Sequence, residues 1–137
     1  MELDFAFLAD AADVASGKLF VMGGAFDTIY VPNFPAVHPV LAVAFRLLLG
    51  PMDLDRKHAL EVTLVDADGR QIASAPGELT AAKSPDLPAG WKQPFILPLR
   101  FLNTPFQKPG HYSIEISIND ALIKAIPLRV VQAAHPK

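Results

Sequence analysis

Thirteen prolines are spread along this chain of 137 residues, and they limit what it can fold into more than any other feature. Proline has no backbone N–H and costs about 3 kcal/mol or more inside a helix, so few windows are long enough for a regular helix. The spacing therefore predicts many short strands. Residues 8–15 leave one alternative open, because this alanine-rich segment could form two turns of helix that end at Gly17.

Three segments alternate between apolar and polar side chains with the period of a β-strand. Residues 112–118 place Tyr and three Ile on one side, and Ser and Glu on the other. Residues 60–64 repeat the pattern with Leu, Val and Leu, and residues 3–7 are expected to point their Leu and both Phe inward. Each segment is predicted to be a strand with one buried face.

Short turn sequences separate such segments. Asp66–Gly69 and Asn119–Asp120 are typical of tight hairpins, and Ser16–Gly17 predicts another hairpin after the first strand. Pro109 and Gly110 fit the two central positions of a type II turn, where proline presets φ and glycine adopts the left-handed conformation.

About eight strands follow from these signals, and regular short strands with turns between them predict an all-β fold, an antiparallel β-sandwich. A chain of this length is expected to form a single domain, residues 1–137. The expected strands span residues 3–12, 19–31, 38–49, 57–66, 70–80, 94–103, 111–118 and 122–131.

Gly23–Gly24 interrupts the second of these strands. Glycine inside a strand loses packing, and it usually marks a bulge or a close approach of the backbone. A loop that holds a phosphate is the alternative, although no Lys-Ser/Thr pair follows and no helix is expected after it. We favour the bulge.

Two segments are apolar on both faces. Residues 40–49 and 95–102 contain no charged side chain apart from Arg46 and Arg100. Each is therefore either a central strand that is covered twice or an edge strand that faces a partner. These two segments contain the apolar residues in excess of what strands with one buried face need, in a chain that is 51% hydrophobic and only 19% charged.

The segments 7–12, 16–24, 64–69, 109–113 and 127–130 together resemble a family of uncharacterised bacterial proteins, a domain of unknown function found in bacteria and their phages. The resemblance covers nearly the whole chain and implies no catalytic residues. From Lys57 to Val130 the chain also resembles immunoglobulin-like modules, in which a Pro-Gly turn and a Tyr-bearing strand precede the last hairpin. This second resemblance implies an immunoglobulin-like sandwich.

Charge and composition argue against several classes of protein. Twelve basic and fourteen acidic residues leave a formal charge of −2, so the chain lacks the excess of positive charge that binding to the phosphates of a nucleic acid requires. The chain has no cysteine, so disulfides and thiolate metal sites are excluded. Three aspartates interrupt residues 1–13, and prolines interrupt the longest uncharged run, residues 28–45, so neither a signal peptide nor a membrane helix is expected. We expect a cytoplasmic protein that binds neither nucleic acid nor membrane.

Catalytic signals are weak. No strained Gly-x-Ser-x-Gly turn is present, and the four histidines, His38, His58, His111 and His135, lack the spacing that places two metal ligands on one helix face. We therefore expect no catalytic residue, no metal and no cofactor. A hydrolase or metal-dependent enzyme whose histidines gather in space remains the alternative.

Phe34, between two prolines, and Trp91, in the long segment 81–94, fall outside the strand pattern. Such rings either contact a partner or cap an open end of the core. The leading interpretation is a non-enzymatic binding or structural module that forms a homo-oligomer or docks a protein partner. An adaptor role in a phage or bacterial assembly is a further possibility.

Overall fold

The structure, a computed structural model, describes residues 1–133. In this part of the chain there are nine strands and one turn of 3-10 helix at Pro51–Asp53. The strands are β1 (Glu2–Ala15), β2 (Lys18–Gly24), β3 (Thr28–Val31), β4 (Ala36–Leu49), β5 (His58–Val65), β6 (Gln71–Leu79), β7 (Gln93–Phe106), β8 (Gly110–Ile118) and β9 (Ala121–Gln132).

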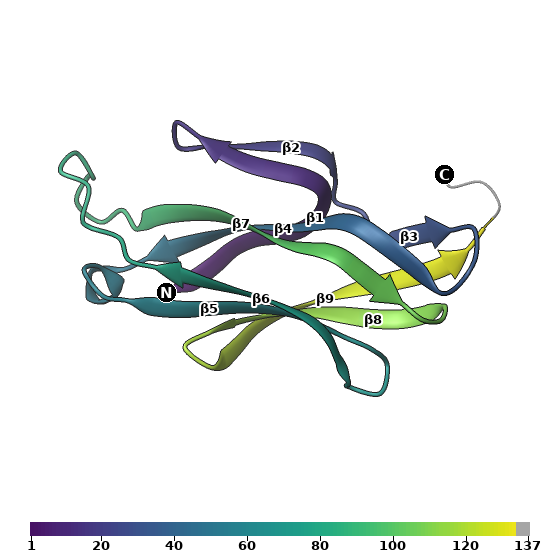
Figure 1. Cartoon of the computed structure of the whole chain (residues 1–137). Helices are drawn as coiled ribbons and strands as arrows, with labels where there is room; N and C mark the ends of the chain where they lie inside the picture. The colour runs from purple at the N-terminus through teal and green to yellow at the C-terminus, as the bar shows by residue number, and fades with distance from the viewer. Residues whose placement is uncertain (134–137) are drawn as a thin grey trace.

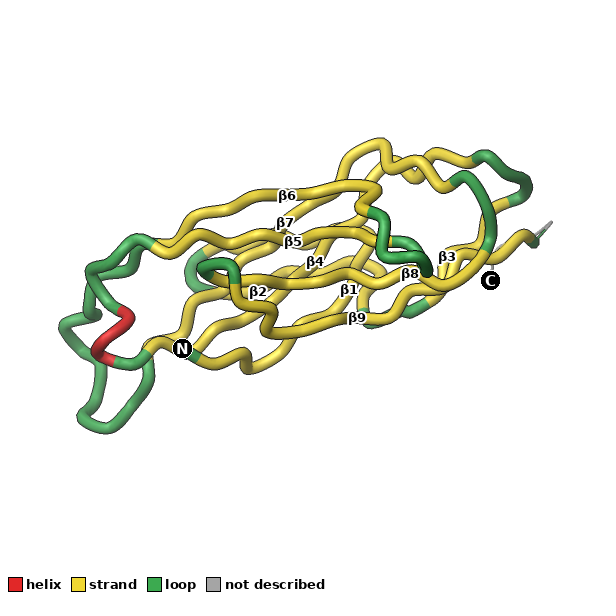
Figure 2. The backbone as a smooth tube through the Cα atoms, turned by 90° about the horizontal axis from the view of Figure 1, so that it is seen from below, coloured by secondary structure: helices red, strands yellow, loops and turns green. Residues whose placement is uncertain are grey.

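The strands form two sheets that pack face to face (Figure 1), so the predicted all-β sandwich is confirmed. One sheet, sheet A, has the order β2-β1-β4-β7, and the other, sheet B, has the order β3-β9-β8-β5-β6. Figure 2 shows the strands of both sheets running along the long axis of the molecule. All of the pairs are antiparallel except β3–β9, which is parallel.

The helical alternative for residues 8–15 is wrong, because β1 continues as a strand to Ala15. Seven of the predicted strands match observed ones to within three residues at either end. The prediction for residues 19–31 is wrong, because the chain leaves sheet A after Gly24 and enters sheet B at Thr28. Ala25 binds the carbonyl of Leu8 and Asp27 binds the N–H of Arg129, so the crossover is tied to both sheets.

The core between the sheets is built from the alternation that the sequence shows. Residues 60–64 and 112–118 bury every second side chain, as predicted. On the facing side, β4 contributes five fully or almost fully buried apolar side chains, Leu41, Val43, Phe45, Leu47 and Leu49.

The prediction that Leu3, Phe5 and Phe7 all face the core is wrong for the two phenylalanines. The register of β1 against β4 shifts between Leu3 and Phe5, and an irregularity of one residue moves the following side chains to the other face. Leu3 packs against the core, whereas Phe7 packs on the outer face of sheet A and Phe5 stacks against it.

The predicted hairpin turns at Ser16–Gly17, Asp66–Gly69 and Asn119–Asp120 are confirmed. The turn at Pro109–Gly110 differs from its prediction. Gly110 is the first residue of β8 and has a φ of 148°, not the value of about 80° that a type II turn requires. Because β7 and β8 belong to different sheets, this segment joins the two layers and does not close a hairpin.

The Asn119–Asp120 turn allows a simple test of its geometry. Asp120 has a φ of 67°, a conformation that costs a residue with a Cβ more than it costs glycine. Asp120→Gly is therefore expected to raise the free energy of unfolding by roughly 0.5–1 kcal/mol in urea titrations. Asn119→Gly is the matched variant. It should destabilise, because the Asn119 side chain binds the backbone N–H of Ala59 and the ring of His58.

Candidate functional site

The hairpin of β1 and β2 forms an arm, residues 10–24, that leaves the sandwich. β1 pairs with β4 up to Ala9 and from there onward pairs with β2 alone. Figure 1 shows the arm curving over the outside of sheet A. The Arg100 guanidinium on β7 donates a hydrogen bond to the carbonyl of Ala12, which holds the arm over this sheet.

Small side chains of β1, at the base of the arm and within it, pack beside the outer face of β4. Ala9 and Ala12 of β1 pack against Ala42 and Ala44, which alternate with the core residues of β4 and lie on its outer face. Residues 40–49 therefore lie in a central strand, the first of the two predicted alternatives, although its outer face is fully buried only at Ala42 and Ala44 and is half-buried at Val40, Arg46 and Leu48. The other segment, residues 95–102, lies in the edge strand β7.

The edge strand of the arm, β2, carries exposed apolar side chains on both of its faces. Phe20, Val21 and Met22 of β2 are 57%, 37% and 74% exposed. Contiguous exposed apolar side chains on a soluble domain are typical of contact surfaces. We call these three residues the arm patch.

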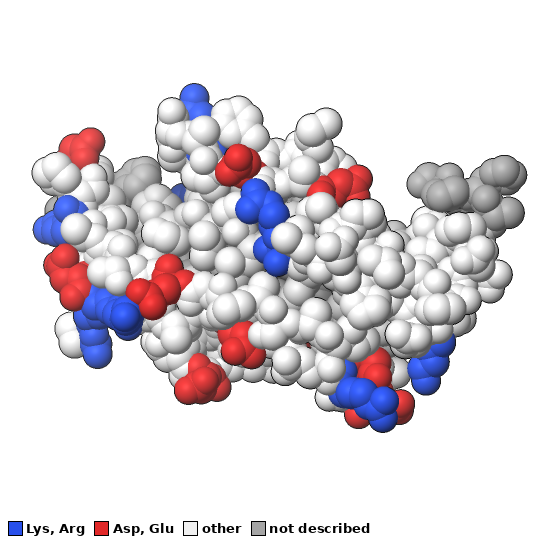
Figure 3. All heavy atoms as spheres, in the orientation of Figure 1, with Lys and Arg blue, Asp and Glu red and all other residues white. Residues whose placement is uncertain are grey.

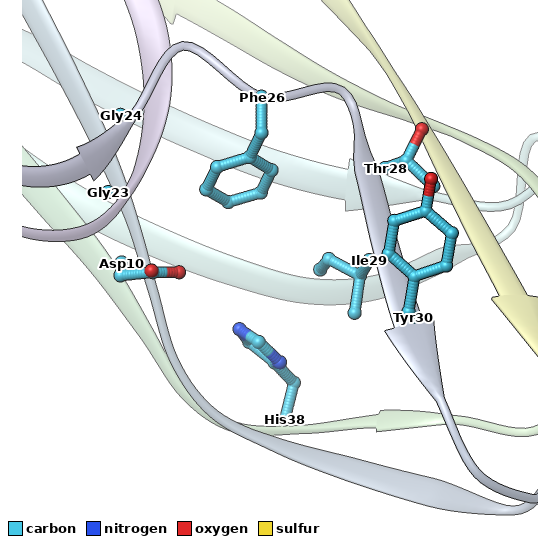
Figure 4. Close-up of a pocket in the computed structure, with 8 residues that line it drawn as sticks. All are labelled: Asp10, Gly23, Gly24, Phe26, Thr28, Ile29, Tyr30 and His38. Carbon is cyan, nitrogen blue, oxygen red and sulfur yellow. The ribbon is translucent and has the colours of Figure 1, made fainter. Parts of the chain in front are cut away.

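A hollow lies where the arm, β3 and β4 meet (Figure 4). Its volume is about 350 Å³, and it is lined by Asp10, Gly23, Gly24, Phe26, Thr28, Ile29, Tyr30 and His38. Figure 4 shows the carboxylate of Asp10 and the ring of His38 reaching into the same space, with the ring of Phe26 beside it and Tyr30 farther away, beyond Ile29. We call it the Asp10–His38 hollow.

The geometry of Gly23 places Asp10 at this hollow. Gly23 has a φ of 60°, and a Cβ at this position would lie 2.2 Å from Oδ2 of Asp10. The pairs on either side, Ala9 with Gly24 and Ala11 with Met22, keep one register, so no extra residue is inserted. The predicted bulge is therefore wrong, and Gly23 marks a close approach between a side chain and the backbone.

Burial sets the protonation of His38. Loss of hydration lowers the pKa of its ring below the ordinary value of about 6.5, while the nearby carboxylate of Asp10 and a backbone contact to Val40 oppose this shift. The unfolded chain therefore binds more protons at this site between the two pKa values, and stability is lost as the pH falls below about 6.5.

We expect NMR titration of the His38 ring to give a pKa below 6.5. Asp10→Asn should lower this pKa further, because it removes the negative charge that favours the imidazolium. In His38→Gln, the free energy of unfolding should fall less between pH 7 and pH 5 than in the wild type. A pKa at or above 6.5 would contradict the burial of the ring.

The structure separates the two aromatic residues singled out from the sequence. Phe34 packs partly buried against the core at the entry to β4, whereas Trp91 is 69% exposed in the loop before β7. Trp91 and Leu49 line one small cavity, so the tryptophan lies at the far end of the 14-residue strand β4. The two rings therefore do not share a surface.

The described histidines lie in different environments. His58 is buried, with Nε2 donating to the carbonyl of Asp53 at 2.8 Å and Nδ1 accepting from Asn119 at 3.0 Å. His111 is exposed, and His135 lies outside the described residues. Within residues 1–133, no three His, Asp or Glu side chains are grouped as metal ligands would be. The described histidines thus do not supply the cluster that the enzymatic alternative requires.

Charged side chains do not gather by sign on the face seen in Figure 3, where Lys and Arg are interspersed with Asp and Glu. Among the described residues, no helix is long and apolar enough to cross a membrane.

Comparison with solved structures gives weak similarities. The chain is 15% identical to a glycosyl hydrolase family 2 member from Bacteroides cellulosilyticus, with a TM-score of 0.39, over 66% of this chain and 12% of that one. It is 15% identical to the alkylpurine DNA glycosylase AlkC from Pseudomonas fluorescens, with a TM-score of 0.43, over 77% and 28%. A beta-glucuronidase from glycoside hydrolase family 2 is 13% identical, with a TM-score of 0.38, over 77% and 12%.

The chain thus spans less than a third of each of these proteins, and scores this low carry no argument about function. None of the curated proteins matches the chain. A family model does match it, over residues 4–131. Because the match takes in almost all of the strands, the chain belongs to this family of unknown function, DUF6941.

Proposed function

We propose that this protein is a binding module that self-associates through the free edge of β2. The observation that carries the proposal is the arm patch on an edge strand that has no proline. Exposed strand edges can pair with another chain, and proteins usually protect them with proline, charge or shortness.

The other three edge strands carry such protection. β7 contains Pro94, Pro98 and Pro105, and β6 contains Pro76 and Glu78. β3 has only four residues. β2 has seven residues and no charge after Lys18. It is therefore the edge best suited to pair with another strand.

Turn geometry indicates which backbone groups of β2 point outward. A two-residue hairpin turn closes on a hydrogen-bonded pair, here Ala15 and Lys18. Alternate residues from Lys18 onward therefore direct their N–H and C=O groups toward β1. Leu19 and Val21 direct theirs away from the arm, where a second strand could bind them.

A second copy of this chain fits the edge. If β2 pairs antiparallel with itself about Phe20, Leu19 of each copy lies opposite Val21 of the other, and both outward residues are satisfied. The two Phe20 rings then meet, and Lys18 lies opposite Met22 instead of the other Lys18. A net charge of −2 adds only weak repulsion between copies.

Sedimentation equilibrium or light scattering tests the proposal. The wild type should form dimers between about 1 µM and 1 mM, the range expected for a small interface. Phe20→Lys should be monomeric over the same range. Leu122→Lys is the matched control, because Leu122 is 58% exposed on a different strand, and this variant should still dimerise. A monomeric wild type, or a dimeric Phe20→Lys, would overturn the proposal.

A cysteine variant tests the register. The native chain has no cysteine, so Phe20→Cys introduces a single thiol. Opposed residues in a pair without hydrogen bonds have Cβ atoms about 4.5–5.5 Å apart, and mild oxidation should link two copies. Leu122→Cys should stay unlinked. Equal linking of the two variants would contradict the pairing about Phe20.

We further propose that the sandwich has immunoglobulin-like connectivity. The order β3-β9-β8-β5-β6, with β3 parallel to β9, is compatible with it. Tyr112 also supports it, since its hydroxyl donates to the carbonyl of Lys108 at 2.6 Å, a contact resembling the tyrosine corner of such domains. A crystal structure in which β8 does not lie between β5 and β9 would contradict this assignment.

A further inference from the structure

We infer that the Asp10–His38 hollow binds a protonated amine or a guanidinium group. This site is separate from the arm patch, since it faces β3 and β4 and contains none of Phe20, Val21 and Met22. It does not depend on the proposed self-association.

Asp10 supplies the charge. It is the one carboxylate that lines the hollow, and none of the described residues forms an ion pair or a side-chain hydrogen bond with it. Arg129, which does not line the hollow, donates to the hydroxyl of Thr28 at 3.2 Å. The negative charge of Asp10 is therefore not neutralised within residues 1–133.

His38 complements this charge as an acceptor. Because burial lowers the pKa of the ring, His38 is neutral at pH 7 and one of its nitrogens carries a lone pair. A cation that donates hydrogen bonds can then contact both the carboxylate and the imidazole. An anion would face the carboxylate and find no charged donor among the residues that line the hollow.

An aromatic ring favours the same ligand chemistry. Phe26 lies beside the space between Asp10 and His38, whereas Tyr30 lines the hollow farther away, beyond Ile29 (Figure 4). Cations bind favourably to the faces of aromatic rings, most strongly where water is excluded. A volume of about 350 Å³ admits a group the size of an arginine side chain.

Arginine and citrulline probes test the charge requirement. N-acetyl-arginine amide is added to the full chain, and the His38 ring resonances are followed by NMR. N-acetyl-citrulline amide is the control, because it has nearly the same shape and no charge. We expect saturable shifts with arginine, at least tenfold weaker binding of citrulline, and a lower pKa of His38 when arginine is bound, since a nearby cation disfavours the imidazolium.

Asp10→Asn should weaken arginine binding at least tenfold. Asp13→Asn is the matched control on the same strand, because Asp13 does not line the hollow, and it should bind arginine as the wild type does. Folding of both variants is checked by urea unfolding. Equal binding of arginine and citrulline, unchanged binding by Asp10→Asn, or no shift at 10 mM probe would overturn the inference.

Two further probes distinguish the source of the cation. Agmatine carries the guanidinium on a small molecule, and Gly-Arg-Gly carries it on a peptide. Tighter binding of agmatine assigns the hollow to a small free cation, and tighter binding of Gly-Arg-Gly assigns it to a peptide side chain; either outcome supports the cation site.

Discussion

Leu41→Ala is expected to lower the free energy of unfolding by about 2–5 kcal/mol. Leu41 is completely buried on the inner face of β4, where it lies opposite Phe101 of β7. Truncation removes apolar contacts and leaves a cavity that rigid strands on both sides cannot fill. The change is measured by urea or thermal unfolding of the purified variant.

Leu102→Ala is the control variant, because it truncates a leucine side chain that is exposed and does not belong to the core. Leu102 follows Phe101 on β7, but its side chain is 66% exposed. Its truncation should change the free energy of unfolding by no more than about 0.5 kcal/mol. Similar losses for the two variants would show that the inner face of β4 is not the core.

His58→Ala is expected to cost about 2–4 kcal/mol of stability. The buried ring connects the carbonyl of Asp53 to the side chain of Asn119, which in turn binds the backbone of Ala59. His58 thus ties the segment after β4 to the β8–β9 turn. Its removal leaves a cavity and unpaired polar groups.

His111→Ala provides the comparison, since His111 is exposed on β8. It should unfold within about 0.5 kcal/mol of the wild type. Equal effects at the two positions would contradict a structural role for His58. This pair of variants distinguishes a histidine that stabilises the fold from one that only occupies the surface.

The sequence predicts this fold well where the signal is local. The alternation at residues 112–118 reports which face is buried, because successive side chains in a strand point to opposite sides. The turn at Ser16–Gly17 is equally readable, since both residues adopt positive φ, which few residue types tolerate. Such features depend on a few neighbouring residues and need no knowledge of distant pairing.

The wrong predictions concern segments whose structure depends on contacts between residues that are far apart in the sequence. Residues 19–31 are mostly apolar and are predicted as one strand, yet Thr28 pairs with Arg129 in the other sheet. The inward prediction for Phe5 and Phe7 failed because of a single irregularity in the pairing of β1 with β4. The period of a strand is visible in a sequence, but the position where that period slips is set by the partner strand.

The candidate sites also divide into features that the local sequence predicts and features that depend on contacts between distant residues. Phe34 and Trp91 stood out because they interrupt local patterns, but the fold places them at opposite ends of β4. Nothing in the sequence links Asp10 to His38, since 27 intervening residues separate them and neither belongs to a motif. The nearest available signal was Gly23–Gly24, a pair of glycines inside an apolar strand.

Prolines, strand periods and turn residues were enough to establish an all-β sandwich, because each acts through backbone dihedral angles and side-chain direction within a few residues. The arm, the parallel β3–β9 pair and the Asp10–His38 hollow emerged only in three dimensions. Each depends on which strands meet across the chain, and that choice is made by the packing of the whole core.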